Sequence, residues 1–360
     1  MNDGLVAGGD LIVRREGTAG VIRLNRPKAI NALSLEMCLG VDAALDRFEN
    51  DPDIAVVLLE GAGERGLCAG GDIRGLYESS TAKGDLGKVF WRQEYTLNAR
   101  IAKYPKPYAA FMDGLVMGGG IGLSAHGRYR IVTERTKLAM PEVGIGIFPD
   151  VGGTWLFSRA PGELGTYLGL TGSAMNGPDA IFAGLADAVV PSNKLGDLRE
   201  ALINLRPGTF QTDVKTQIER FATGETSGPI ASLRHQIDEW FAYDSLEEIV
   251  GALRRSGSEP ALSTLKALGG KSPRAMKVTL RLLRLARLSS SLEECLVREY
   301  RAALEAFRTD DFREGVRAAV IDKDRKPKWS PAFMEDVTSE MIEPYFAAIG
   351  ADELTFSNGK

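Results

Sequence analysis

Two carboxylates within one apolar, glycine-rich stretch have the clearest chemical potential in this sequence. Glu142 and Asp150 both lie in the segment MPEVGIGIFPDVGG, which covers residues 140–153. Carboxylates in apolar surroundings tend to have raised pKa values, and they can act as an acid, a base or a nucleophile. The alternative interpretation is a solvated loop with two surface acids, and this stretch alone does not decide between them.

Two further stretches are rich in small residues and could supply hydrogen-bond donors. The segment CAGGDI at 68–73 follows an apolar run, and the segment MGGGIG at 117–122 opens a predicted helix. Glycine lets backbone N–H groups approach a ligand closely, and the first N–H groups of a helix have no partner within the helix. Two such groups that converge on one point make an oxyanion hole. Each loop taken alone is also explained by a tight turn or by close backbone packing.

Strands that alternate with helices are expected to position these loops. Apolar runs at 11–13 and 21–24 predict a hairpin, and the continuous apolar run at 54–59 predicts a buried strand. Ser34 suits the N-cap of a helix whose apolar residues recur at helical spacing as far as Phe48. Further strands are expected at 107–112 and 129–132. This alternation favours an α/β architecture with buried strands.

The sequence changes character near residue 191, after which nearly all expected elements are helices. Ser227 is the expected cap of one of them, with Pro229 in its first turn. The expected helices cover residues 197–205, 214–221, 227–243, 246–255, 260–268, 275–288 and 292–307. The sequence therefore predicts an α/β core at 1–190 and a mainly helical C-terminal region at 191–360.

Composition and charge exclude several classes of protein. The chain has 360 residues, of which 44% are hydrophobic and 26% charged, so a core of ordinary size can form. The net charge of −4 provides no basic field that would recruit nucleic acid. Arg281, Arg284 and Arg287 form a local basic cluster, which is interpreted as the solvated face of a helix. Since no stretch reaches about 18 apolar residues, no membrane span is expected.

Cysteine usage and the N-terminal segment bear on the compartment. The three cysteines are sparse, and no Cys/His spacing indicates a zinc site or a disulfide framework. The first residues show neither the charged and apolar regions of a secretory signal nor the Arg/Ser-rich pattern of a transit peptide. We therefore predict a reducing compartment, with the cytoplasm as the default.

Taken together, the three loops resemble the crotonase (enoyl-CoA hydratase/isomerase) superfamily over roughly residues 10–190, because they occur in the expected order and at the expected separations. The segments LTG at 170–172 and GLA at 184–186 agree with this resemblance. It implies an α/β fold of the crotonase-like (ClpP/crotonase) type, a spiral of ββα units with a helical C-terminal region. It also implies that the N–H groups of Gly71 and Gly119 form the oxyanion hole for a CoA thioester carbonyl.

Departures from the hydratase pattern indicate a narrower subfamily. Hydratases of the superfamily usually carry a glutamate where this chain has Gly122, and typically glycine where it has Asp150. Glu142 together with Asp150, without an acid at 122, is similar to the 3-hydroxyisobutyryl-CoA hydrolase subfamily. The segment FWRQEY, in which Glu94 matches a substrate-contacting glutamate, also resembles it. So do the segments SAHG at 124–127 and DFREGVRA at 311–318.

This resemblance implies hydrolysis of 3-hydroxyisobutyryl-CoA to 3-hydroxyisobutyrate and CoA, a step of valine catabolism that needs no cofactor and no metal. Glu142 would attack the thioester carbonyl or direct a water to it, and the sequence does not separate these routes. Asp150 would bind the substrate's 3-hydroxyl or hold Glu142 and the water in place. Glu94 would be a second polar contact at the acyl end, and Gly119 would contact the substrate through its N–H.

Two other functions stay open at this point. The first is an enoyl-CoA hydratase or isomerase acting on another acyl-CoA, against which Gly122 and Asp150 argue. The second is a protein that only binds a CoA ester or RNA, although the net negative charge weakens the case for RNA. The expected partner is an acyl-CoA substrate, with neither nucleic acid nor membrane. A homo-oligomer is possible on the resemblance, since crotonases often assemble through C-terminal helices.

Overall fold

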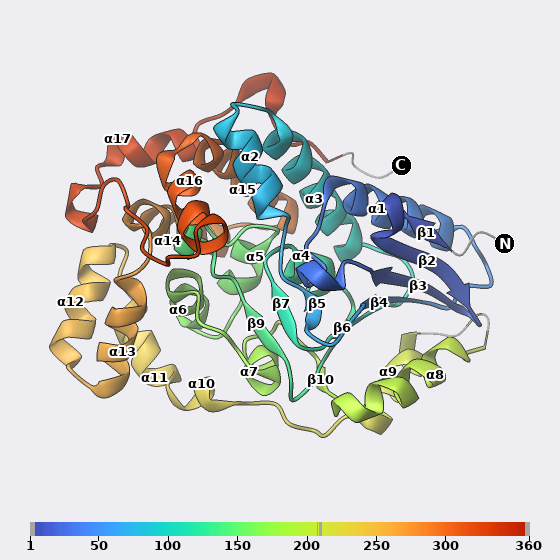
Figure 1. Cartoon of the computed structure of the whole chain (residues 1–360). Helices are drawn as coiled ribbons and strands as arrows, with labels where there is room; N and C mark the ends of the chain where they lie inside the picture. The colour runs from blue at the N-terminus through green and yellow to red at the C-terminus, as the bar shows by residue number, and fades with distance from the viewer. Residues whose placement is uncertain (1–3, 207, 209–210, 357–360) are drawn as a thin grey trace. The chain divides into compact units, whose positions relative to one another are not determined.

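The computed structural model describes residues 4–206, 208 and 211–356. They fall into two compact units, and each unit draws on three separate stretches of chain (Figure 1). The first unit comprises Met1–Gly71, Thr96–Leu138 and Met175–Ala231, and the second comprises Asp72–Tyr95, Ala139–Ala174 and Ser232–Lys360. The predicted division of the sequence near residue 190 stays a prediction.

The first unit is built on a seven-stranded sheet with strand order β1-β2-β3-β4-β6-β8-β10. Strands β2 and β3 pair antiparallel, which confirms the predicted hairpin, whereas β3, β4, β6, β8 and β10 run parallel. Parallel strands covered on both faces need apolar side chains throughout, and the run at 54–59 meets this need. The bounds are Leu5–Val6, Leu11–Glu16, Ala19–Leu24, Val56–Gly61, Tyr108–Met112, Tyr129–Val132 and Ala188–Val189.

Helix α1 (Leu35–Glu49) packs beside β2 and β3, as Figure 1 shows. Its N-cap is Ser34, as predicted, and the hydroxyl accepts a hydrogen bond from the N–H of Met37 at 3.2 Å. The ring of Phe48 lies against Gly20 of β3, where a Cβ atom would come within 2.5 Å of it. The absence of a side chain at Gly20 therefore lets the last turn of α1 pack directly on the sheet.

A second sheet has three short strands in the order β5-β7-β9, namely Gly66–Cys68, Leu115–Met117 and Lys137–Ala139. Neither β5 nor β7 was predicted as a strand from the sequence, because strands of three residues show no period of alternation. Strands β5 and β7 pair in parallel. One glycine loop follows β5 and the other follows β7, so this small sheet sets where both loops begin.

Helices complete the first unit. Two of them, α8 and α9, cover the sheet with Leu198, Leu202, Val214 and Ile218, which belong to the same buried cluster as Leu58 of β4. The helices are α4 (Gly119–Ser124), α7 (Gly177–Phe182), α8 (Leu195–Ile203) and α9 (Gln211–Phe221), together with the last residues of α3 (Leu86–Ala102) and most of α10 (Pro229–Ser232).

The second unit is mainly helical, and the helices expected beyond residue 245 occur within two residues of their predicted ends. The helix predicted at 227–243 is instead divided at Leu233 into α10 and α11, because Leu233 has a ψ of −5° and departs from helical geometry. The helices are α2 (Ile73–Thr81), the first part of α3, α5 (Gly153–Ser158), α6 (Leu164–Thr171), α11 (Arg234–Phe241), α12 (Leu246–Ser256), α13 (Glu259–Leu268), α14 (Pro273–Arg287), α15 (Leu292–Arg308), α16 (Asp310–Val316) and α17 (Ser339–Ile342). Within the described ranges, the helices are too short or too polar to cross a membrane.

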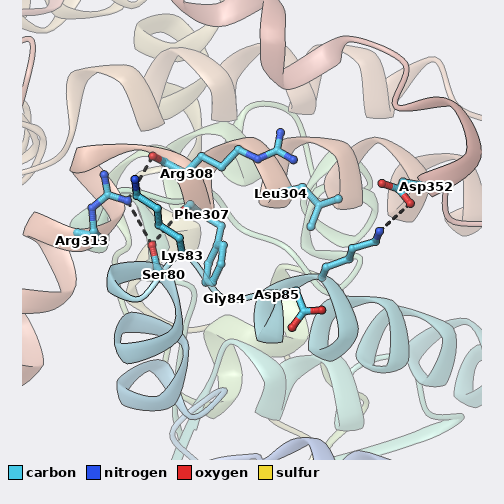
Figure 2. A pocket seen from close by; sticks show the side chains of 10 residues that line it. Ser80, Lys83, Gly84, Asp85, Leu304, Phe307, Arg308, Arg313 and Asp352 are labelled. Atoms are coloured by element: carbon cyan, nitrogen blue, oxygen red, sulfur yellow. Dashed lines mark hydrogen bonds and ion pairs between the residues drawn. The ribbon is translucent and has the colours of Figure 1, made fainter.

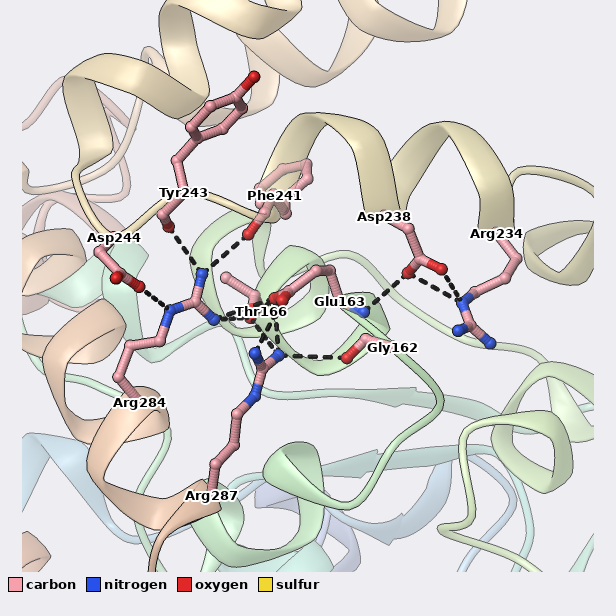
Figure 3. Close-up of polar contacts among 10 residues, drawn as sticks. All are labelled: Gly162, Glu163, Thr166, Arg234, Asp238, Phe241, Tyr243, Asp244, Arg284 and Arg287. Carbon is pink, nitrogen blue, oxygen red and sulfur yellow. Dashed lines mark hydrogen bonds and ion pairs between the residues drawn. The ribbon is translucent and has the colours of Figure 1, made fainter.

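The basic cluster on α14 is not a solvated face, which corrects the interpretation made from the sequence. Figure 3 shows the guanidinium groups of Arg284 and Arg287 directed at the carboxylate of Glu163, with shortest distances of 3.0 and 2.6 Å. Arg284 also donates to the backbone carbonyl of Phe241. Arg281 pairs with the exposed acid Glu343, and Arg284 additionally pairs with the exposed acid Asp244. Two of the three arginines therefore tie α14 to the start of α6.

Candidate active site

The predicted backbone donors both belong to the first unit. Gly71 follows β5, and Gly119 is the first residue of α4, directly after β7. A Cβ atom at Gly70 would lie 3.9 Å from the backbone nitrogen of Gly119, so the two loops run close together. Within the described part of the chain, no hydrogen bond is found from the N–H of Gly71 or of Gly119. Both groups are therefore available to a bound oxygen atom.

Glycine is required where α4 approaches β5. A Cβ atom at Gly120 would lie 2.8 Å from both the Cβ and the carbonyl oxygen of Cys68, which is closer than such atoms can approach. Gly118, with a φ of +46°, makes the turn from β7 into α4. The glycines of this loop thus bring the second donor close to the first, which the composition alone did not establish.

The three predicted acids all belong to the second unit, where the structure brings them together. Glu94 lies on α3, Glu142 begins a 3₁₀ helix (Glu142–Ile145), and Asp150 lies in the loop before α5. Their exposed fractions are 2%, 7% and 7%. The pKa of Glu94 is raised well above its usual value by burial and then by the charges of Asp150 and Glu142. Burial and the charge of Asp150 likewise raise the pKa of Glu142.

Asp150 is buried like the other two acids, and two aromatic side chains donate hydrogen bonds to it. The hydroxyl of Tyr95 donates to Oδ2 at 2.8 Å, and the side chain of Trp91 is a second donor. Burial raises the pKa of Asp150 to about 6, and these hydrogen bonds oppose the rise. Both aromatic residues lie in the segment FWRQEY, but sequence analysis gave them no role.

Two oxygen atoms in this cluster lack a hydrogen-bond partner. They are Oε1 of Glu94 and Oε2 of Glu142, and both are buried without a partner among the described residues. Buried polar atoms are almost always hydrogen-bonded, so an unpaired one needs an explanation such as a missing ligand. These two oxygens are consistent with a site that binds a polar substrate.

A half-buried cation, Lys271, accompanies the acids. A Cβ atom at Gly144 or at Gly172 would lie 3.5 Å from its Nζ atom, which places Lys271 beside the 3₁₀ helix of Glu142. Its charge lowers the pKa of Glu142, while burial lowers the pKa of Lys271 itself. Sequence analysis missed Lys271 because it lies in no motif and is distant along the chain from the acids.

A cavity of about 480 Å³ in the second unit is separate from this cluster. Figure 2 shows its lining, which includes Lys83, Phe307 and Arg308. Lys88 also lines the cavity, and it pairs with Asp352 at 2.6 Å. None of the three predicted acids lines it. The backbone donors of the first unit and the acid cluster of the second unit, rather than the residues that line this cavity, are therefore the candidate functional groups.

Fold and site together define the class of enzyme. Residues 19–346 match the enoyl-CoA hydratase/isomerase family, and the chain belongs to this family. A crystal structure described as a carnitinyl-CoA dehydratase from Mycobacterium thermoresistibile superposes with a TM-score of 0.91 at 44% identity, covering 97% of this chain and 99% of that one. The crotonase fold expected from the sequence is confirmed.

Among characterised relatives, the similarity extends over nearly the whole chain. The mitochondrial 3-hydroxyisobutyryl-CoA hydrolase of Rattus norvegicus is 42% identical, covering 96% of this chain and 91% of the relative. The enzyme of the same name from Homo sapiens is 40% identical with the same coverage. The resemblance to this subfamily is thereby confirmed, whereas the roles of individual site residues stay predictions.

Proposed function

We propose that this enzyme hydrolyses 3-hydroxyisobutyryl-CoA to 3-hydroxyisobutyrate and CoA. The similarity to hydrolases of that name supports the substrate. One observation carries the reaction type: Glu142 and Asp150 share a buried acidic cluster, while residue 122 is a buried glycine in α4. A hydratase of this superfamily usually has a glutamate at that position, so the pair of acids needed to add water across a double bond is incomplete.

In the proposed mechanism, the N–H groups of Gly71 and Gly119 donate to the thioester carbonyl oxygen. Negative charge grows on this oxygen as the carbonyl carbon becomes tetrahedral. A preorganised donor at such a position contributes about 3 kcal/mol to the transition state. Because the donors are backbone groups with no hydrogen-bond partner among the described residues, they need no rearrangement when the substrate binds.

Glu142 supplies the base or the nucleophile. Its raised pKa makes the ionised carboxylate a stronger base than an ordinary glutamate. In one route, Glu142 attacks the carbonyl carbon, the C–S bond breaks, and water then hydrolyses the resulting anhydride. In the other route, Glu142 takes a proton from a water that attacks the same carbon. Both routes release CoA as a thiol and leave the 3-hydroxy acid.

Asp150 and Glu94 recognise the acyl group. Asp150, whose pKa burial raises to about 6, is ionised at neutral pH and can accept a hydrogen bond from the substrate's 3-hydroxyl. Burial raises the pKa of Glu94 and so favours its protonated form, which can donate a hydrogen bond as well as accept one through Oε1, an atom without a partner among the described residues. An acyl-CoA without the 3-hydroxyl would leave Asp150 buried without this partner, which disfavours it.

The test is free-thiol release from 3-hydroxyisobutyryl-CoA, with hydration of crotonyl-CoA measured on the same preparation. Rapid thiol release with negligible hydration is the expected result. Hydration without thiol release would overturn the proposal and favour a hydratase or dehydratase, the class to which the 44% identical structure is ascribed. Including 3-hydroxypropionyl-CoA measures the contribution of one methyl group, which is worth about 1–3 kcal/mol of discrimination.

The compartment and the oligomeric state are separate questions. The cytoplasmic location and the possible homo-oligomer both stay predictions from the sequence. The similar rat and human hydrolases carry the word mitochondrial in their names. Cell fractionation and light scattering of the purified enzyme would answer the two questions directly.

A further inference from the structure

Glu299 of α15 is a buried acid that the proposed mechanism does not use. Its side chain is fully buried, and both of its oxygens accept hydrogen bonds. Oε2 accepts from the N–H of Gly152 at 2.7 Å, and Oε1 accepts from the N–H of Thr154 at 3.0 Å and from the Thr154 hydroxyl. All three donors lie at the start of α5, directly after Asp150. Glu299 therefore caps the first turn of α5 from a helix that is remote in sequence.

The loop that Glu299 holds has an unfavourable backbone. Val151 and Gly152 have φ values of +52° and +78°, so both lie in the left-handed region. A β-branched residue such as valine rarely adopts this conformation, and it persists only where the surroundings enforce it. The N–H of Gly153 donates to the carbonyl of Asp150 at 2.6 Å, which links the turn to the acid. The direction of the Asp150 side chain thus depends on a turn that needs external support.

Helix α15 also supports the other end of the Asp150 side chain. Tyr300, the neighbour of Glu299, packs edge-to-face against Tyr95 with ring centroids 6.3 Å apart. Tyr95 in turn donates its hydroxyl to Asp150. Two consecutive residues of one helix therefore hold the backbone beside Asp150 and the aromatic ring that donates to its carboxyl group.

We propose that Glu299 is a positioning residue for Asp150, which fixes the direction of the Asp150 carboxyl group by holding the N–H groups of Gly152 and Thr154. The effect on the reaction rests on the proposed function, whereas the effect on the geometry does not. Glu299 itself has no contact with the substrate in this proposal. It acts only through the loop that carries Asp150.

The variant Glu299→Gln is the direct test. Glutamine keeps the size of the side chain but has one acceptor oxygen, whereas both oxygens of a carboxyl group can accept with or without its proton. One of the two backbone N–H groups must therefore face the amide NH₂ group. We expect kcat/KM for thiol release to fall about a hundredfold, the loss typical of a small misplacement of a catalytic group. Thr154→Val removes only the hydroxyl donor, and it should show a smaller loss in the same direction if Glu299→Gln folds poorly.

A double-mutant cycle separates positioning from a merely structural role. In an Asp150→Asn background the direction of the carboxyl group no longer matters. Adding Glu299→Gln or Thr154→Val to this background should therefore lower kcat/KM by less than about threefold. If Glu299→Gln lowers kcat/KM by the same factor with Asp150→Asn as without it, the proposal is overturned. Glu163→Gln is the matched control, because Glu163 is a carboxylate of the same unit that also accepts from several donors (Figure 3). The factor by which Glu163→Gln changes kcat/KM should be the same with and without Asp150→Asn.

A crystal structure of Glu299→Gln gives a readout that does not depend on the substrate. We expect the hydrogen bond from Tyr95 to Asp150, 2.8 Å in the unsubstituted protein, to be broken while α15 keeps its place. An unchanged Asp150 would overturn the proposal even if the enzyme proves to be the hydrolase. If the unsubstituted enzyme releases no thiol, the proposed function fails and the crystal structure alone decides the role of Glu299.

Discussion

Four buried carboxyl groups lie together in the second unit, and Lys271 lies near them. They belong to Glu94, Glu142, Asp150 and Glu299. Burial disfavours the charged form of each, so their pKa values rise, to about 6 for Asp150 and about 8 for Glu299. They consequently lose their protons at different pH values. Such a spread lets one acid accept a hydrogen bond while its neighbour still holds a proton. The first three acids were predicted from sequence because they lie in recognisable segments, whereas Glu299 and Lys271 have no local signal.

The substitution Glu142→Gln tests the proposed base or nucleophile. An amide can neither take a proton from water nor attack the thioester, so kcat for thiol release should fall about a hundredfold or more. Glu239→Gln, on an exposed side chain, is the control that should leave kcat unchanged. A Glu142→Gln enzyme within about tenfold of the parent would show that another group performs this step.

The substitution Lys271→Met tests what sets the ionisation of Glu142. The positive charge of Lys271 lowers the pKa of Glu142, so its removal should raise that pKa further. Since activity requires ionised Glu142, the acid limb of the profile of kcat/KM against pH should move to higher pH. Lys277→Met is the control, because Lys277 pairs with Glu247 and should leave the limb in place. Coincident profiles for Lys271→Met and the parent would rule out this influence.

Elements of the first unit position the backbone donors through the small sheet of β5, β7 and β9. Five of the seven strands of the large sheet were predicted, because apolar runs mark them, whereas β1 and β10 have only two residues each and were missed. Sequence analysis also missed the small sheet, since strands of three residues beside glycine loops show no periodicity. The proximity of the loops at Gly71 and Gly119 could therefore be inferred from the family resemblance but not from local pattern.

Gly120→Ala tests this proximity. The added methyl group would meet Cys68 at 2.8 Å and push α4 away from β5, so activity should fall and the protein should lose about 1–3 kcal/mol of stability. Gly196→Ala is the matched control, because a Cβ atom there meets nothing within 4 Å in α8. There, alanine should be neutral or stabilise by up to about 1 kcal/mol. Urea denaturation and the thiol assay on both variants check the prediction. Equal stability and equal activity of Gly120→Ala and Gly196→Ala would contradict it.

The whole molecule should show a dependence of stability on pH that follows from the buried acids. Folding raises the pKa of Glu299 from 4.5 to about 8, so the folded protein holds a proton that the unfolded chain releases in this range. Stability from this group is complete below the unfolded pKa and is lost as pH rises through the folded pKa. The free energy of unfolding should therefore be lower at about pH 9 than at about pH 6.

Urea denaturation at both pH values measures this difference, which should shrink in Glu299→Gln because the amide does not titrate. Glu163→Gln should preserve the difference, since ion pairs with Arg287 and Arg284 lower the pKa of Glu163 against the effect of its burial. Its contribution to stability is therefore lost only as pH falls to acidic values. A difference that is the same in Glu299→Gln and the parent would exclude Glu299 as its source.

The position of α15, which follows all the proposed catalytic residues in sequence, has a consequence for protein synthesis. A ribosome produces the loop of Asp150 long before it produces Glu299 and Tyr300, which hold that loop and its aromatic partner. A nascent or truncated chain that ends before residue 292 thus contains every proposed catalytic group but lacks the support for one of them. Hydrolytic activity should therefore appear only after α15 has been synthesised, and chains that end before residue 292 should not consume the thioester.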